Sequence, residues 1–428
     1  MSVWVERPLS KFRPLSVLFV LAVAAWMLAT ATPLEDDEIA RAVVILAVLI
    51  TVSIGLFSIA AREDHGEGPL FWVLFLSFGL KLLAMSFRFS VGLLADAILY
   101  DRYGAGIAQV IQQGGWPEFT RMWGTEFIRL LVGIVYFVTG RTFYGISILW
   151  AWFGLLGILF FYKAFKTAFP TANRRHYMLI FFYPSMLLWT SSLGKDALVV
   201  FCLGMATLGA ARALRQIDFM GLLWLGLGMS GLLMIRPHIA AVFAVALGVG
   251  FLLRPIRAGK MTAVIRVVGA VFFIAVSVFV LRTASGFIGV DVLSTEEVFG
   301  FIDITRERTT TGGSAFQQVN PRSPAALLAG IPTVLFRPFP WEAHRTYALF
   351  SALEGTAILV LTLVRWRSLR AAIADSRRNG FLMLIVVYVL LFTFFFSAIG
   401  NFGIIARQRV QLLPFLFMLL FYKRSPER

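Results

Sequence analysis

The sequence contains a single cysteine, Cys202, and few charged residues. One cysteine cannot form an intramolecular disulfide or supply the paired thiolates of a structural zinc site. The four histidines lack the spacing of a zinc motif, and the sequence has no P-loop, Rossmann fingerprint or internal repeat. Without a nucleotide-binding motif, the energy for any reaction must come with the substrate or from an ion gradient.

Apolar residues dominate the composition. They make up 59% of the 428 residues, against 14% that are charged. A soluble domain does not contain so many apolar runs long enough to cross a bilayer. We therefore expect an all-α polytopic membrane protein. The formal net charge of +16 does not indicate nucleic-acid binding, because the basic residues flank the apolar runs, as the positive-inside rule expects.

Twelve apolar runs are interpreted as transmembrane helices. The first is expected to be retained, because no clear small-residue cleavage site follows it. With both termini in the cytoplasm, and with Arg41, Arg266 and Arg409 at the run ends counted with the adjoining segments, the inner segments hold 22 Lys and Arg against 7 Asp and Glu. The outer segments hold 15 of each, and charge bias orients short loops in this way. The runs cover residues 15–31, 41–61, 70–88, 143–162, 177–192, 197–211, 220–235, 239–253, 263–281, 346–364, 380–398 and 408–422.

The apolar segment 126–140 does not fit this scheme as a span. It is shorter than a bilayer crossing requires and carries Glu126 and Arg129, so we interpret it as an amphipathic helix at the outer interface, with a thirteenth span as the alternative. The expected organisation is one integral membrane domain over 1–428, a first outer loop at 89–142 that contains this interfacial helix, and a large outer loop at 282–345.

Two pairs of expected spans are unusually short. Residues 177–211 and 220–253 are each too short for two full crossings and a turn. We therefore expect their polar turns to dip into the membrane, where such backbone must face protein or water. Pro184 and Pro237 are expected to break the helices at these turns.

The conspicuous polar clusters all fall on the expected outer face, which indicates one outward-opening site. Asp96, Asp101 and Glu342 are candidate general bases for a sugar hydroxyl, and ordinary solvated charges are the alternative for the two aspartates. The basic residues suit phosphate oxygens. Helix capping is the alternative for Lys195 and Asp196, and snorkelling at the outer interface is the alternative for Arg407 and Arg409. The candidate binding residues are Lys195, Asp196, Arg236, His238, Arg337, Arg407 and Arg409.

Arg407 and Arg409 allow two arrangements. On an extended turn both side chains would face the same way. On a helix they would diverge by about 200°, so that at most one would point inward.

Several of these segments resemble bacterial membrane glycosyltransferases of the GT-C type and the related O-antigen-like polysaccharide polymerases. They are the acidic stretch "DAILYDRYGAGIA" after an early span, the interfacial "GTEFIRLLVGIVYFVTG", "YPSMLLWTSSLGKDAL", and "ARQR" before "LLPFLFMLLF". The resemblance covers most of the chain as an architecture, with loose motifs. One departure is the spacing of Asp96 and Asp101, because such enzymes commonly carry a tight acidic pair in the first outer loop.

The resemblance implies transfer of a sugar or glycan repeat unit from a polyprenyl-(di)phosphate donor at the outer face of the bacterial inner (plasma) membrane. Asp96 or Asp101 would be the base, and the phosphate-binding residues would come from Lys195, Arg236, Arg337, Arg407 and Arg409. The implied partners are the lipid-linked donor, the bilayer and other polysaccharide-assembly proteins. No cofactor is implied with certainty, and a divalent cation is left open. The alternative is a transporter or flippase of lipid-linked glycans, which would use Lys81 and Glu354 within expected spans.

Overall fold

A computed structural model describes most of the chain as helix. The described residues form no strand, and one isolated antiparallel bridge joins Ala315 to Asn401. The chain divides into two compact units, Met1–Leu159 with Met178–Phe201, and Phe160–Tyr177 with Cys202–Arg428. The described residues are 13–30, 36–64, 69–119, 122–216, 218–253, isolated positions between 275 and 285, 295–309, 315–316, 324–343 and 346–424.

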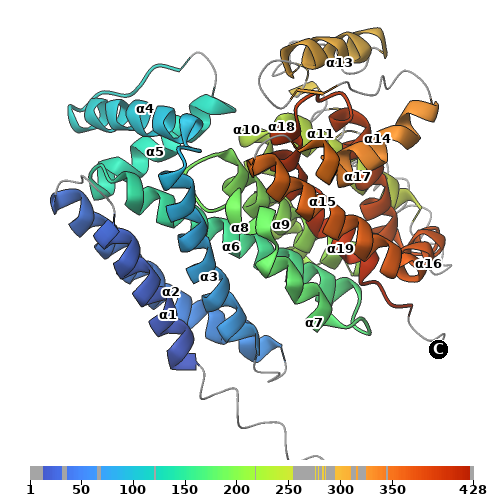
Figure 1. The fold of residues 1–428 in the computed structure, drawn as a ribbon, viewed down its shortest axis with the longest axis horizontal. Helices are drawn as coiled ribbons and strands as arrows, with labels where there is room; N and C mark the ends of the chain where they lie inside the picture. Colours follow the sequence, from blue (N-terminus) through green and yellow to red (C-terminus); the bar gives the residue numbers. More distant parts are fainter. Residues whose placement is uncertain are drawn as a thin grey trace, which may run out of the picture. The chain divides into compact units, whose positions relative to one another are not determined.

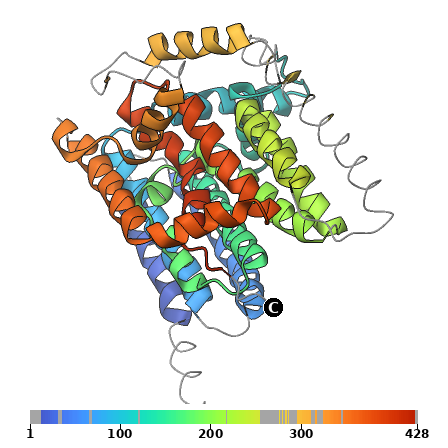
Figure 2. The ribbon, with the colours of Figure 1, turned by 90° about the vertical axis from the view of Figure 1, so that its right-hand side faces the viewer.

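The first unit is organised around one central helix, α3. It packs against α1, α2 and the short helix α8. Figures 1 and 2 show α1, α2 and α3 running side by side, with α4 lying across one end of them. The helices of this unit are α1 (Arg13–Thr30), α2 (Asp36–Glu63), α3 (Pro69–Ser90), α4 (Ala95–Gln112), α5 (Thr125–Thr139), the first part of α6 (Phe143–Ala168), η2 (Met178–Phe182), α8 (Pro184–Leu188) and the start of α9 (Lys195–Arg215).

Helices α4 and α5 form a closely packed pair. Glycines allow the approach, because a Cβ on Gly104 would lie 2.2 Å from Val132 Cγ1. The outward side of α5 is apolar, with Ile134, Phe137 and Val138 exposed at helical spacing. A helix over 126–139 is therefore confirmed, with one apolar exposed side, and its place at the outer interface stays a prediction.

The segment 177–192 differs from the single span expected. It forms the 3₁₀ helix η2 and then the five-residue helix α8, which begins at Pro184. A proline has no backbone N–H and disfavours a helical residue before it, so the chain breaks at Tyr183. Pro237 acts similarly in the second unit, where Arg236 leaves the helical conformation between α10 and α11. The break at Pro237 is confirmed at its expected turn, whereas the break at Pro184 lies at Tyr183, before the polar turn at 191–196.

The second unit is built around α17. This helix packs against α11, α14, α16 and α19. The described part of the expected loop 282–345 contains the helices α13 and α14. The elements of this unit are the end of α6, α7 (Arg174–Tyr177), the rest of α9, α10 (Phe219–Ile235), α11 (Pro237–Leu252), α13 (Thr295–Thr309), α14 (Pro324–Phe336), η3 (Pro340–Glu342), α15 (Thr346–Val364), α16 (Trp366–Ser376), α17 (Gly380–Phe396), α18 (Phe402–Gln408), η4 (Arg409–Gln411) and α19 (Leu413–Leu420).

Within the described part of the chain, four helices are long and apolar enough to cross a membrane, namely Asp37–Glu63, Pro69–Ser90, Phe143–Ala168 and Lys195–Arg215. Two further pairs bend sharply, Ala348–Val364 with Trp366–Ser376 by 71°, and Phe402–Gln411 with Leu413–Leu420 by 61°. Counting each pair as one span gives six among the described residues. The chain is therefore a multi-pass helical membrane protein.

The described spans are fewer than the twelve expected from hydropathy. Some expected spans are apolar helices too short for a straight crossing, namely Pro14–Met27, Phe219–Ile235, Pro237–Leu252 and Gly380–Phe396. The expected span at 263–281 lies outside the described residues, apart from isolated positions.

Candidate functional site

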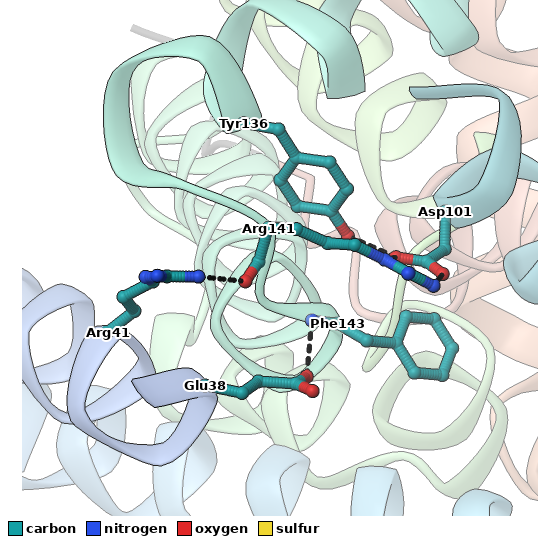
Figure 3. A network of polar contacts seen from close by, with 6 residues as sticks. All are labelled: Glu38, Arg41, Asp101, Tyr136, Arg141 and Phe143. Carbon is teal, nitrogen blue, oxygen red and sulfur yellow. Dashed lines mark hydrogen bonds and ion pairs between the residues drawn. The ribbon is translucent and has the colours of Figure 1, made fainter. Parts of the chain in front are cut away.

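Asp101 lies at the centre of a polar network in the first unit (Figure 3). Its carboxylate accepts a hydrogen bond from the Tyr136 hydroxyl at 2.7 Å and two from the Arg141 guanidinium at 3.3 and 2.5 Å. Burial and the neighbouring carboxylate raise the pKa of Tyr136, so this hydroxyl keeps its proton and remains a donor. Asp101 is buried, and its oxygens serve three donors. This arrangement suits a structural anchor better than a general base.

The same network ties α2 to the turn between α5 and α6. Arg41 donates to the Arg141 carbonyl at 3.1 Å, and the Phe143 N–H donates to the Glu38 carboxylate at 2.7 Å (Figure 3). Gly140 in this turn has a φ of 75°, which favours glycine. The contacts join residues about a hundred positions apart, so they hold the α4–α5 pair against α2 and α6.

Asp96 lies in a different environment from Asp101. It is exposed in the first turn of α4, one and a half helical turns before Asp101. An acidic side chain is favourable at a helix N-terminus. Of the three carboxylates predicted as bases, Asp96 is the one whose side chain is largely open to solvent.

Lys195 and Asp196 begin α9, as the helix-capping alternative requires. Lys195 Nζ donates to Thr125 Oγ1 at 2.9 Å, which links the turn to the start of α5. Asp196 is buried. The nearby Ser192 hydroxyl is buried too, and this hydroxyl has no hydrogen-bond partner among the described residues.

Three polar side chains on one face of α3 donate hydrogen bonds to backbone carbonyl groups of the segment 177–192, which is broken at Tyr183. Ser77 donates to Phe181 O at 2.8 Å, and Arg88 donates to Leu188 O at 3.4 Å. Between them, Lys81 donates to Met186 O at 2.9 Å and to the hydroxyl of Thr190. Lys81 is fully buried, and its partners among the described residues are neutral oxygens. These donors satisfy carbonyls that a broken span would otherwise leave without partners in the membrane.

In the second unit, a buried polar group forms where two helices break. Arg236, between α10 and α11, donates to Gln408 Oε1 near the end of α18. Gln411 Nε2 donates to the same oxygen at 2.6 Å. Arg236 is 6% exposed and Gln411 is fully buried. The sequence indicated Arg236 by its position beside Pro237, whereas nothing local indicated that Gln408 is its partner.

Arg409 is fully buried beside this group. Its guanidinium donates to Val334 O at 3.0 Å and to the Arg337 carbonyl, both at the end of α14. It thereby supplies donors to carbonyls that the helix end leaves unbonded. Arg407 is only half-buried in α18. The helical alternative for these two arginines is therefore confirmed, and their surroundings differ as that geometry predicts.

Arg337 and Glu342 form an ion pair beside two aromatic rings. Arg337 Nε donates to Glu342 Oε1 at 2.9 Å, and each side chain is 20% exposed. The Arg337 guanidinium also lies 4.4 Å from the centre of the Phe316 ring and 5.1 Å from that of Phe402. Burial opposes ionisation of Glu342, but hydrogen bonds from Arg337 and the Phe339 N–H outweigh it and hold its pKa below the ordinary value. A carboxylate with a lowered pKa is a weak base.

The second unit thus brings together three of the five predicted polar clusters, at 235–238, 336–342 and 400–409. His238 belongs to the first of these and lies in the first turn of α11, its ring 6.4 Å from that of Phe396. The clusters at 95–104 and 191–196 belong to the first unit, where both make hydrogen bonds to α5. The described residues contain no group of three or more His, Cys, Asp or Glu side chains arranged to hold a metal ion.

Sequence reasoning missed Tyr136 and Arg141, the donors to Asp101. Their signal was weak, because a tyrosine in an apolar run and an arginine after a glycine are ordinary at a membrane interface. Comparison with known proteins yields no matching family model, no similar curated protein and no similar solved structure.

Proposed function

We propose that the protein transfers a sugar or glycan repeat unit from a polyprenyl-(di)phosphate donor to an acceptor in cell-surface polysaccharide biosynthesis. The supporting observation is the presence in the second unit of two arginines at helix ends, Arg236 after α10 and Arg337 after α14. Guanidinium groups bind phosphate oxygens through paired hydrogen bonds, and ionised residues within a membrane protein are otherwise costly.

The proposal includes a finer architecture. The chain crosses the bacterial inner membrane twelve times in a GT-C-like arrangement, with both termini in the cytoplasm and the chemistry on the extracytoplasmic face. The four to six spans of the described part are compatible with this number if the short and broken helices also cross. Short or broken spans would provide lateral entry for a polyprenyl chain.

The reaction requires little beyond these residue types. The acceptor hydroxyl oxygen attacks the anomeric carbon while the bond from that carbon to the phosphate oxygen breaks. The phosphate or diphosphate leaves with the electron pair, and an arginine or lysine stabilises its charge. A carboxylate takes the acceptor's proton. The activated bond comes with the lipid donor, so no nucleotide site is needed.

Asp96 is the proposed base. Its exposure contrasts with Asp101, which three donors engage, and with Glu342, whose pKa is lowered. In the first unit, which carries Asp96, Lys195 is proposed for the phosphate group; in the second unit, Arg236 and Arg337 are the candidates for this role. Arg409 is assigned a structural part, because its guanidinium binds two backbone carbonyls.

A second function, the flipping of lipid-linked glycans, is favoured by Lys81. This lysine is fully buried in the candidate span α3, and ionisable residues at such positions often serve transport. The hydrogen bonds of Lys81 to neutral oxygens also explain this lysine as a structural residue that holds the segment 177–192. Flipping therefore ranks second.

The first experiment examines a strain that lacks the protein. Surface glycan chain length would be measured together with the amount and sidedness of lipid-linked oligosaccharide. Single repeat units stranded on lipid at the outer face indicate a polymerase, and an under-decorated glycan indicates a transferase. Intermediates trapped at the inner face indicate a flippase instead. An unchanged glycan pool would contradict both functions.

Complementation with paired variants then tests the residue roles. Asp96→Asn should lower activity by roughly 10²- to 10⁴-fold, the usual effect of losing a general base, with normal membrane insertion and thermal stability. Asp101→Asn should lower thermal stability and reduce activity only in proportion to the folded protein. Arg102→Gln, an exposed change on the same helix, serves as the control. Full activity of Asp96→Asn would overturn the assignment of the base.

A further inference from the structure

Among the buried polar atoms of the second unit that make no hydrogen bond within the described part of the chain are Gln411 Oε1 and the Tyr388 hydroxyl. Both side chains are fully buried. A buried polar atom without a partner is destabilising, and native proteins usually supply an ordered water where no protein group reaches it. These two atoms therefore indicate a missing polar partner.

The orientation of the Gln411 amide follows from its neighbour. Gln408 Oε1 accepts hydrogen bonds from both Arg236 and Gln411. An oxygen can only accept here, so the Gln411 amide nitrogen must face it. The Gln411 oxygen consequently points elsewhere and needs a donor.

Tyr388 lies close to the same place. Its ring centre is 4.3 Å from that of Phe415, which follows Gln411 by four residues. The elements that carry these residues also pack together, α11 against α17 and α17 against α19. The surrounding rings of Phe243 and Phe392 leave the hydroxyl as the polar part of an otherwise apolar environment. Three elements, α17, η4 and the break between α10 and α11, thus place polar groups together.

We propose that Tyr388, Gln411 and Arg236 line an internal site for an ordered water molecule. The water donates one O–H to Gln411 Oε1 and accepts a hydrogen bond from the Tyr388 hydroxyl, which satisfies both buried atoms. It also hydrates the helix break that carries Arg236, because non-helical backbone within a membrane protein requires protein or water around it. This site does not depend on the proposed glycan chemistry.

Radiolytic hydroxyl labelling of the purified wild-type protein tests the site, because radicals formed from a bound water modify the side chains beside it. Tyr177 is the matched control: it is also fully buried in the second unit, and its hydroxyl already donates to Pro414 O at 3.1 Å. Tyr388 should be labelled at least about tenfold faster than Tyr177, since only Tyr388 adjoins the water. Equal rates for the two tyrosines would overturn the proposal.

A second experiment with isotopically labelled water distinguishes a bound internal water from transient opening of the site to bulk solvent. After mixing with H₂¹⁸O, the hydroxyl group that radiolysis adds to Tyr388 should contain ¹⁸O later than the one added to the exposed Tyr103. Exchange at Tyr388 as fast as at Tyr103 would mean opening to bulk solvent and would also overturn the proposal. In Gln411→Met, which removes the acceptor, labelling of Tyr388 should fall by about fivefold or more, and an unchanged rate would contradict the role of Gln411.

Discussion

At the scale of single residues, burial and ion pairing act on Glu342 in opposite directions. Burial favours the protonated carboxyl, whereas Arg337 and the Phe339 N–H favour the carboxylate and prevail, so the pKa of Glu342 falls below the ordinary glutamate value. A carboxyl with a lowered folded-state pKa contributes stability above its unfolded pKa. That contribution is lost as the pH falls through the folded pKa.

Glu342→Gln should therefore destabilise the protein by about 1–2 kcal/mol at pH 7, the usual size of a partly buried charged hydrogen bond. The difference from wild type should shrink as the pH falls below the ordinary glutamate pKa, because wild-type Glu342 then becomes protonated as well. Thermal unfolding in detergent at several pH values measures this difference. Glu118→Gln, at an exposed position, is the control, and a difference that persists undiminished in acid would refute the ion-pair explanation.

Lys81 illustrates a second residue-scale effect, the satisfaction of backbone carbonyls by a distant side chain. In Lys81→Met, Met186 O and Thr190 lose their ammonium donor while the side chain stays similar in length. Amide hydrogen exchange over residues 184–194 should become about tenfold faster, as expected from the loss of roughly 1.4 kcal/mol of local stability. Lys166→Met is the control, and unchanged exchange over 184–194 would show that Lys81 does not hold this segment.

At the scale of elements, the α4–α5 pair depends on glycine at its contact. A Cβ at Gly104 would come within 2.2 Å of Val132, and one at Gly133 within 2.3 Å of Ile107. Gly106, in the same helix, has nothing within 4 Å of the equivalent position. The two glycines of α4 therefore provide a matched pair of sites.

Gly104→Ala should destabilise the protein by about 1–3 kcal/mol, because packed side chains or helices must move apart. Gly106→Ala should be neutral or stabilising by up to about 1 kcal/mol, since alanine is the better helix former. Thermal unfolding of both variants measures the effect. Equal stability of the two would mean that α4 and α5 do not pack as described.

At the scale of the whole molecule, the main prediction concerns topology. Gln113 lies in the expected first outer loop, and Ala374 lies in an expected cytoplasmic segment; both are exposed. The native Cys202 is buried, so it should contribute little background labelling. Introduced cysteines at these two positions can therefore report on the two sides of the membrane.

In cells whose outer envelope layer has been removed and whose plasma membrane is intact, a membrane-impermeant maleimide should label Gln113→Cys but not Ala374→Cys. Both should react once the membrane is permeabilised, because positive charge keeps the 365–379 loop in the cytoplasm. The reverse pattern would invert the topology, and labelling of both positions in intact cells would exclude the twelve-span arrangement.

Much of the fold could be predicted from local sequence. The long apolar runs predicted α2, α3, α6 and α9, because hydropathy over about twenty residues is a property of the run itself. Pro237 similarly predicted the break before α11, since proline acts on its own backbone and the preceding residue. The large outer loop expected at 282–345 stays a prediction, and its described part includes the short apolar helix α14, which the sequence analysis did not predict.

By itself, the sequence determined that this is a multi-pass helical membrane protein and which residue types occur at its polar turns. Only the tertiary structure separated Asp101 from Asp96, buried Arg409 rather than Arg407, and joined Lys81 to carbonyls more than a hundred residues away. Hydropathy and proline act over one helix or one turn, whereas the environment of a charge depends on partners from distant segments. Those partners become neighbours only when the helices pack.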